Sequence, residues 1–199
     1  MAVSRPKAWT WILLLVALAF VQRAGIVLAP KAYLYGQPAG GDLGIKFGEE
    51  IARGNVAADL IEGPVLPLIE YQYAHFFGGS LVVGILAVPS FLLFGPSLWA
   101  LKLVPVLVHL AGVLLLFRLL DRHASRRAAV FGGLLYALSP PGYAQLTTVA
   151  WGSHVESNAL ALAALSLYLD LRGSERPLRA RFWLGLLLGF GLYFGCWLL

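Results

Sequence analysis

The sequence predicts an all-α bundle of membrane-spanning helices, and three observations support this fold class. Of the 199 residues 59% are apolar and 13% are charged, and the mean hydropathy is +0.77. A soluble domain has about 45–50% apolar residues. The apolar residues gather in long runs, and about 20 such residues cross a bilayer as one helix. Basic and acidic residues fall in different segments, as expected for a polytopic membrane protein.

The first apolar run, residues 8–29, follows a basic N-terminus and is predicted to be the first span. A cleaved signal peptide is the alternative, because it also combines a basic start with an apolar run. Gln22 and Arg23 interrupt the run before any cleavage site, which favours the span. We expect the long side chain of Arg23 to reach the outer membrane interface.

The next segments are predicted to lie on the membrane surface. Within the outer loop, residues 30–79, apolar residues recur every four positions between charged ones, and Gly54-Asn55 ends the pattern. This predicts an interfacial amphipathic helix over residues 43–53. Residues 80–94 form the shortest apolar run, 15 residues with a proline near the end, and are interpreted as re-entrant or interfacial.

The basic loops at residues 121–127 and 172–181 decide the number of spans. If all six apolar runs crossed, both loops would lie outside, whereas short Lys/Arg-rich loops stay in the cytoplasm. Leaving out residues 80–94 returns both loops to the cytoplasm together with the N-terminus. The prediction is a single membrane domain, residues 1–199, multi-pass in a bacterial inner membrane. About five spans are expected, at residues 8–29, 98–117, 128–149, 155–171 and 182–199.

Asp42 is the first candidate for chemistry. It follows a Gly-Gly turn at the start of the predicted interfacial helix, near the outer end of the first span. A carboxylate there can act as general base toward an acceptor hydroxyl or amine. The alternative is that Asp42 is the N-cap of the helix and accepts a backbone N–H. One residue can fill both roles.

Glu156 and His154 are candidates in the short outer loop 151–157, which emerges on the same side as Asp42. Pro140-Pro141 break the preceding helix near its outer end, and irregular backbone at that depth chiefly lines cavities or is buried in protein. The alternative is that both are ordinary polar residues of a short loop.

Lys102 lies near the outer start of its span. Its ammonium either snorkels to the interface or binds the phosphate of a lipid-linked substrate as a point charge.

Several other functions are without support. The basic residues are confined to short loops, so no nucleic-acid partner is expected. The only cysteine, Cys196, lies in an apolar run, which excludes an internal disulfide and a Cys-based metal site. No phosphate-binding loop or nucleophile elbow is present. No metal ligands are assigned and no cofactor is predicted, while a requirement for a divalent metal stays open.

Four segments taken in order carry a resemblance: GDLGIKFGEEIARGN, GGSLVVGILAVPSFLLFGPSLWALKLVP, LLDRHASRRAAVFGGLLYALSPP and AWGSHVESNALALAALSLYL. Together they resemble the bacterial multi-pass glycosyltransferases of the GT-C class. That group is related to the protein O-mannosyltransferases, the lipid A aminoarabinose transferases and the rhizobial lipopolysaccharide sugar transferases. The resemblance covers residues 9–199 and depends on the order of the elements.

The resemblance implies an outward-facing enzyme that takes a sugar from a polyprenyl-phosphate carrier. It implies that Asp42 is the catalytic base and that residues 43–53 and 80–94 match the family's interfacial helices. Many members carry a second acid where this chain has Leu43. Members are also longer, so the chain is expected to be the N-terminal, truncated part of such an enzyme, and the activity of this part alone stays open.

The predicted function is a hexosyl or pentosyl transferase of the cell envelope. It would move a sugar from polyprenyl phosphate to a glycan, lipid or protein acceptor on the outer face of the lipid bilayer. A single displacement would invert the anomeric centre. The alternative is a non-catalytic polytopic membrane subunit or transporter half, which the missing second acid and the short chain favour.

Overall fold

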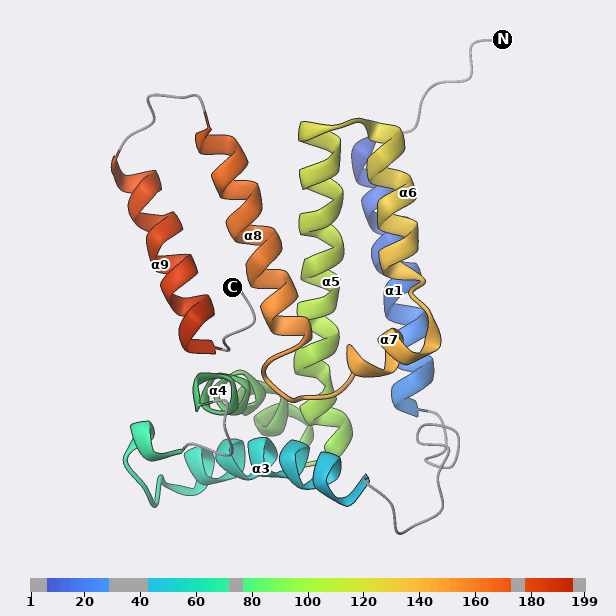
Figure 1. The fold of residues 1–199 in the computed structure, drawn as a ribbon. Helices are drawn as coiled ribbons and strands as arrows, with labels where there is room; N and C mark the ends of the chain where they lie inside the picture. Colours follow the sequence, from blue (N-terminus) through green and yellow to red (C-terminus); the bar gives the residue numbers. More distant parts are fainter. Residues whose placement is uncertain (1–6, 29–42, 72–76, 173–177, 195–199) are drawn as a thin grey trace.

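The structure of the protein, a computed structural model, describes residues 7–28, 43–71, 77–172 and 178–194. Every regular element in these ranges is a helix. In Figure 1 one set of helices runs side by side along a common direction, and a second set lies across one end of it.

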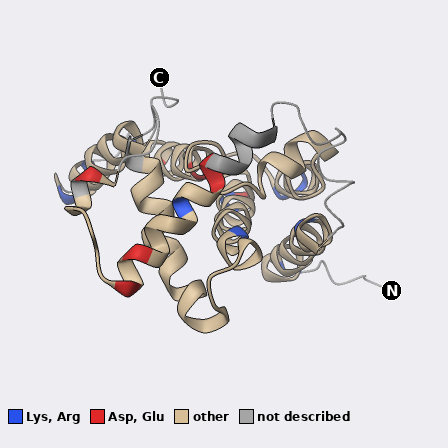
Figure 2. Ribbon diagram, turned by 90° about the horizontal axis from the view of Figure 1, so that it is seen from below, with Lys and Arg blue, Asp and Glu red and all other residues tan. Residues whose placement is uncertain are grey.

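The first set comprises α1 (Ala8–Leu28), α5 (Leu98–His123), α6 (Arg126–Ala137), α8 (Val155–Leu171) and α9 (Leu178–Phe194). The second set comprises α3 (Leu43–Glu62) and α4 (Phe77–Phe94), and Figure 2 looks onto this end. Two short elements, η1 (Leu68–Glu70) and α7 (Pro141–Leu146), complete the described fold. The all-α prediction is therefore confirmed for these ranges.

The long helix α5 holds the molecule together because it borders both hydrophobic clusters. On the side away from α3 and α4 its residues Val113 and Phe117 pack with Leu15 of α1 and Ala129 of α6. Toward the other end Leu101 and Val104 pack with residues of α3 and α4. Ser97 starts α5 by accepting a hydrogen bond from the Ala100 N–H at 3.4 Å, as an N-cap does.

Two of the described helices, α1 and α5, are long and apolar enough to cross a membrane. Five spans are not established. Helix α6 has 12 residues and is thus about 18 Å long, shorter than the hydrocarbon core of about 30 Å. It ends before Pro140, and α7 begins at Pro141, so the break expected at this proline pair is present. Helix α4, which includes residues 80–94, lies across the end of the bundle (Figure 1), and the interfacial interpretation of this segment stays a prediction.

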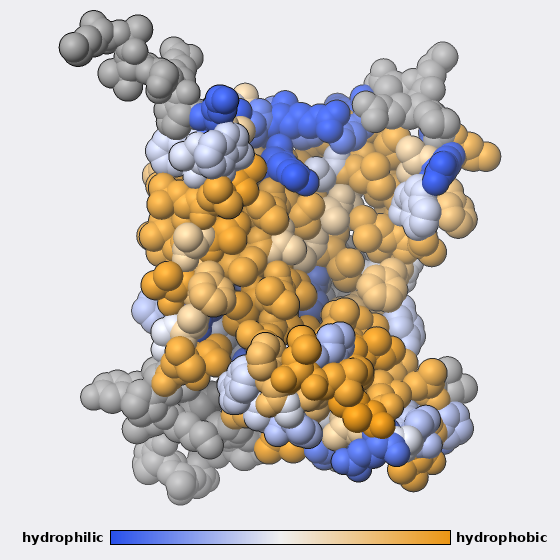
Figure 3. Space-filling view, turned by 180° about the vertical axis from the view of Figure 1, so that it is seen from behind, coloured by the Kyte–Doolittle hydropathy of each residue, from blue (hydrophilic) through white to orange (hydrophobic). Residues whose placement is uncertain are grey.

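The charge asymmetry reappears in three dimensions. The start of α1, the turn between α5 and α6, and the end of α8 with the start of α9 all lie at the end opposite to α3 and α4 (Figure 1). Figure 3 shows a hydrophilic band at this end above a broad apolar zone. Arg122 donates to Asp170 at 2.7 Å and links α5 to α8 there. We call this region the basic end.

The predicted stop of the interfacial helix was wrong. Helix α3 does not end at residue 53 but continues to Glu62. A β-carbon at Gly54 would lie 3.5 Å from Leu101 and 3.7 Å from Phe91, so this glycine packs against α5 and α4 instead of ending the helix. Val56 and Ala57 are buried on the same helix. Gly63, with a φ of +123°, and the following proline mark the actual end.

Candidate functional site

The site is built around the loop between α7 and α8, residues 147–154. It contains Gly152 at a φ of +74°, a conformation in which a side chain would be strained. Thr148 closes the first turn of the loop by donating to the Gln145 carbonyl at 2.8 Å. Three contacts then hold the loop, to α3 and α5, to α4, and to α1.

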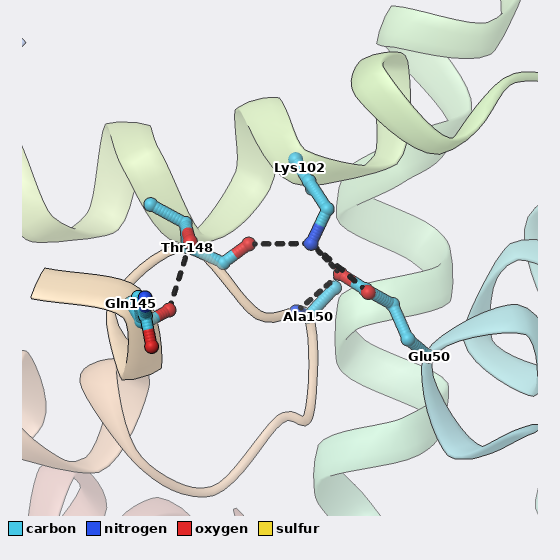
Figure 4. Close-up of polar contacts among 5 residues, drawn as sticks. All are labelled: Glu50, Lys102, Gln145, Thr148 and Ala150. Carbon is cyan, nitrogen blue, oxygen red and sulfur yellow. Dashed lines mark hydrogen bonds and ion pairs between the residues drawn. The ribbon is translucent and has the colours of Figure 1, made fainter. Parts of the chain in front are cut away.

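The first contact is a buried ion pair between Glu50 of α3 and Lys102 of α5. The Lys102 Nζ lies 2.8 Å and 3.0 Å from the two Glu50 carboxylate oxygens and donates to the Thr148 carbonyl at 3.1 Å. Glu50 Oε1 also accepts from the Ala150 N–H at 3.0 Å. Both side chains are almost fully buried, and Figure 4 shows them facing the loop backbone. The pair therefore ties the loop to two helices at once.

The second contact brings the backbones of α4 and the loop together. A β-carbon on Gly79 would lie 1.9 Å from the Gly152 carbonyl oxygen, and one on Gly152 would lie 2.4 Å from the Gly79 carbonyl oxygen. Only glycine permits such an approach from both sides. No local sequence pattern predicts that these two glycines meet, although GGS and WGS are short glycine motifs.

The third contact comes from Arg23 of α1, and here the expected exposure at the membrane interface was wrong. The side chain is fully buried. Its Nε donates to Thr147 Oγ1 at 3.2 Å and its Nη2 to Ser139 Oγ at 2.5 Å, while Nη1 donates to Ala137 and Gln22 oxygens. The side chains and carbonyls around the α6–α7 break give it enough acceptors to stay inside the protein.

Next to the ion pair lies a second group of buried charges. Arg53 is fully buried and donates from Nη1 to the Glu49 carbonyl at 2.5 Å. Its Nε and Nη2, and both carboxylate oxygens of Glu156, find no hydrogen-bond partner within the described ranges. Burial lowers the pKa of the Arg53 guanidinium, while Glu49, Glu156 and Glu50 raise it. Arg53 and Glu156 are thus both buried and interact electrostatically, but no ion pair joins these two described residues.

His154 points to another place. It lines a pocket of about 320 Å³ between α7 and the first turns of α8, together with Tyr143 and Ser157. Ser153 Oγ lies 2.8 Å from its Nδ1, and its ring meets that of Trp151 with centroids 4.9 Å apart. Burial lowers the pKa of His154 and Glu49 raises it, the burial effect being larger. The imidazole is therefore neutral at neutral pH, so one of its two ring nitrogens carries no proton.

The four site residues from the sequence are thus not all brought together. Asp42 lies outside the described residues. His154 lines the pocket, whereas Glu156, two residues later, is buried and does not line it. Lys102 has all three N–H donors engaged, so a phosphate contact, which stays a prediction, would require it to exchange one of these acceptors. Within the described ranges no group of three or more His, Cys, Asp or Glu side chains is placed to hold a metal ion.

One comparison with known proteins agrees with the resemblance to the GT-C glycosyltransferases. No curated protein and no solved structure matches the chain significantly. The model of one family, described as dolichyl-phosphate-mannose-protein mannosyltransferase, matches residues 80–196. The matched segment runs from α4 through α9 and contains Lys102, the loop and the pocket. It makes up more than half of the 199 residues, and it gives coarse support to a membrane glycosyltransferase of the GT-C type. The chain belongs to the dolichyl-phosphate-mannose-protein mannosyltransferase family.

Proposed function

We propose that the protein transfers a sugar from a polyprenyl-phosphate carrier to an acceptor at the membrane face where α3, α4 and the α7–α8 loop lie. The observation that carries the proposal is that the family match, residues 80–196, coincides with the helices that build the loop and its pocket. The family's description names dolichyl-phosphate mannose as the donor, so a mannosyl carrier is the first substrate to test.

The proposed reaction is one displacement at the anomeric carbon. An acceptor oxygen or nitrogen loses its proton to a base and bonds to the anomeric carbon, while the bond from that carbon to the phosphate oxygen breaks. Polyprenyl phosphate leaves with the bonding electrons, and the anomeric configuration is inverted. Asp42 is the proposed base, because it follows the outer end of the first span and directly precedes α3.

The described residues would support this reaction by position. His154 is a neutral imidazole that lines the pocket, so it can take up or relay the proton that the acceptor substrate loses. Glu156 is buried and does not line the pocket, so we propose no substrate contact for it and only an electrostatic effect on Arg53. Lys102 would reach a carrier phosphate only by giving up the Thr148 carbonyl or a Glu50 oxygen.

The charge pattern supports the proposed orientation. The basic end would face the cytoplasm of a bacterial inner membrane, because short basic loops are retained there. The opposite end, with α3 and α4 across it, would then lie at the outer interface (Figure 1).

One observation favours the alternative of a non-catalytic subunit or transporter half. Among the residues that line the pocket, all of them within the described ranges, none is an aspartate or glutamate. Catalysis in the proposed enzyme therefore depends on Asp42, and its substitution is the critical experiment.

The test compares Asp42→Asn with the matched variant Asp59→Asn, in the full-length protein reconstituted in nanodiscs with polyprenyl-phosphate mannose. Asn is as good an N-cap as Asp but accepts no proton, so Asp42→Asn should express normally and lose about 10²–10⁴ in turnover. Asp59→Asn changes a carboxylate of the same loop and helix segment, and should transfer like the wild type.

Near-normal turnover of Asp42→Asn would refute this base and move the search to His154 and Glu156. If the wild-type protein transfers no sugar from a panel of polyprenyl-phosphate sugars, the non-catalytic alternative is favoured.

A further inference from the structure

The pocket between α7 and α8 has polar groups but no formal charge in its lining. Lys, Arg, Asp and Glu are all absent from the residues around it. The charged groups nearby, Glu50 with Lys102 and Arg53 with Glu156, are buried elsewhere and do not line the pocket. The α7–α8 loop therefore separates an ionic cluster from a neutral pocket.

The polar groups of the pocket come from one face of α8 and its lead-in. Ser153 and Ser157 are four positions apart, as are His154 and Asn158, and residues four apart in a helix lie on one face. Glu156 lies off this face and does not line the pocket.

One hydroxyl in this lining has no partner. Only 5% of Ser157 is exposed, and its Oγ, itself almost inaccessible to solvent, makes no hydrogen bond within the described part of the chain. A ligand in the pocket would reach this hydroxyl after a rotation about χ1. A buried hydroxyl without a partner costs free energy, so such a group is commonly satisfied by a ligand or water. Asn158, one residue on, donates to the Tyr143 hydroxyl at 2.8 Å, which fixes the amide at the pocket edge.

We propose that this pocket binds an uncharged polyhydroxylated ring, the sugar of a glycosyl donor or of a glycan acceptor. The pocket volume of about 320 Å³ lies at the lower end of small-molecule sites. Hydroxyl, amide and imidazole groups match the alternating donors and acceptors of a sugar, and Leu146, Val155 and Ala161 offer apolar surface to its C–H groups. A phosphate would find no cation in the lining to compensate its charge. This inference rests on the proposed function, and binding can be measured without turnover.

The experiment measures binding of a short-chain alkyl mannoside to the full-length protein in phosphatidylcholine nanodiscs, free of glycosidic detergent. Calorimetry gives the Kd. The fluorescence of Trp151, whose ring contacts that of His154, reports occupancy, with Trp151→Phe as the background. Ser157→Ala removes the unpartnered hydroxyl, and Ala161→Phe fills the pocket. Ser166→Ala is the matched control, the same change on the same helix but away from the pocket.

We expect Ser157→Ala to raise the Kd about five- to tenfold, the effect of losing one hydrogen bond to the ligand. Ala161→Phe should abolish binding, and Ser166→Ala should bind like the wild type. A short polyprenyl-phosphate mannose distinguishes the two sources. If the pocket holds the donor sugar, this compound displaces the mannoside and binds less well to both pocket variants. If the pocket holds an acceptor sugar, the short polyprenyl-phosphate mannose does not displace the mannoside and binds equally well to the wild type and the pocket variants.

Three results would overturn the inference. They are no binding of the mannoside to the wild-type protein, wild-type affinity in both Ser157→Ala and Ala161→Phe, and displacement of the mannoside by an alkyl phosphate of equal chain length. Failure of the proposed function would look different, because the mannoside would bind and respond to the variants while no sugar transfer occurs. If the protein transfers the sugar but both pocket variants bind the mannoside with wild-type affinity, the proposed function stands and the proposed sugar site is rejected.

Discussion

Lys102 and Glu50 form an ion pair with one another and also make hydrogen bonds to the loop backbone. The three N–H donors of Lys102 meet two carboxylate oxygens and the Thr148 carbonyl, and Glu50 also accepts from the Ala150 N–H. Each charge is buried and compensated, so removing one leaves the other uncompensated in the protein interior. This arrangement gives the pair a role in positioning the loop that carries His154 and leads into α8, where Glu156 lies.

Lys102→Met should therefore lower the free energy of unfolding by about 3–5 kcal/mol, because the Glu50 carboxylate stays buried without its cation. Glu50→Gln should cost less than Glu50→Ala, since the amide oxygen of glutamine still accepts from the Ala150 N–H. The double variant Glu50→Gln/Lys102→Met should recover part of the loss. Thermal unfolding of the four proteins in nanodiscs measures these differences. A stable Lys102→Met protein with only a raised KM for the lipid donor would instead make Lys102 a phosphate ligand.

The sequence identified three residues of this region and missed their partners. Lys102 stands out in the sequence because it lies near the outer start of an apolar run, but its partner Glu50 is 52 residues away in the chain, and no local pattern links them. His154 and Glu156 were grouped because both are ionisable in one loop. In the structure Glu156 is buried, whereas His154 lies beside α7, which forms one side of the pocket. Such directions follow from tertiary packing.

At the level of the elements, glycines set how closely α4 approaches its neighbours. Gly84 faces Val56 of α3, where a β-carbon would lie 2.5 Å from the Val56 Cγ1, and Gly79 faces Gly152 of the loop. Close approach through small residues is how helices pack where the surrounding lipid gives no hydrophobic driving force. Helix α3 continues past Gly54 because the residue packs closely against its neighbours, although glycine has a low intrinsic helix propensity. Helix existence was thus predictable here and its end was not.

Gly79→Ala tests the contact between α4 and the loop. The added methyl would lie 1.9 Å from the Gly152 carbonyl oxygen, so the backbones must separate, and we expect a loss of about 1–3 kcal/mol or more in unfolding free energy. Gly25→Ala is the matched control, because nothing lies within 4 Å of a β-carbon at this position of α1. It should be neutral or stabilise by about 0.5–1 kcal/mol. Equal stability of the two variants would show that α4 does not rest on the loop backbone.

For the whole molecule, the distribution of charge predicted more than the lengths of the apolar runs. Because basic loops stay on one side of the membrane, we expect the N-terminus and residues 121–127 and 172–181 at one end of the molecule. The described helices that flank these segments do meet at one end (Figure 1). The number of spans was harder to predict, because α6 is short and α7 follows a proline break. A helix that is broken in the middle appears as one apolar run in the sequence but forms two helices in the structure. At the break the buried Arg23 donates hydrogen bonds to the Ala137 carbonyl and the Ser139 hydroxyl.

The last prediction concerns the orientation of the molecule in the bilayer. Ala124 lies at the basic end, directly after α5, and Val65 is 81% exposed in the segment after α3 at the opposite end. In a Cys196→Ser background, Val65→Cys should react with a membrane-impermeant maleimide in intact cells, and Ala124→Cys only after permeabilisation, because short basic loops are retained in the cytoplasm. Both positions are surface sites, so folding should be unaffected and the difference should report topology alone. Labelling of Ala124→Cys from outside, with Val65→Cys protected, would invert the molecule and place the loop and its neutral pocket at the cytoplasmic face, out of reach of an outward-facing lipid-linked sugar.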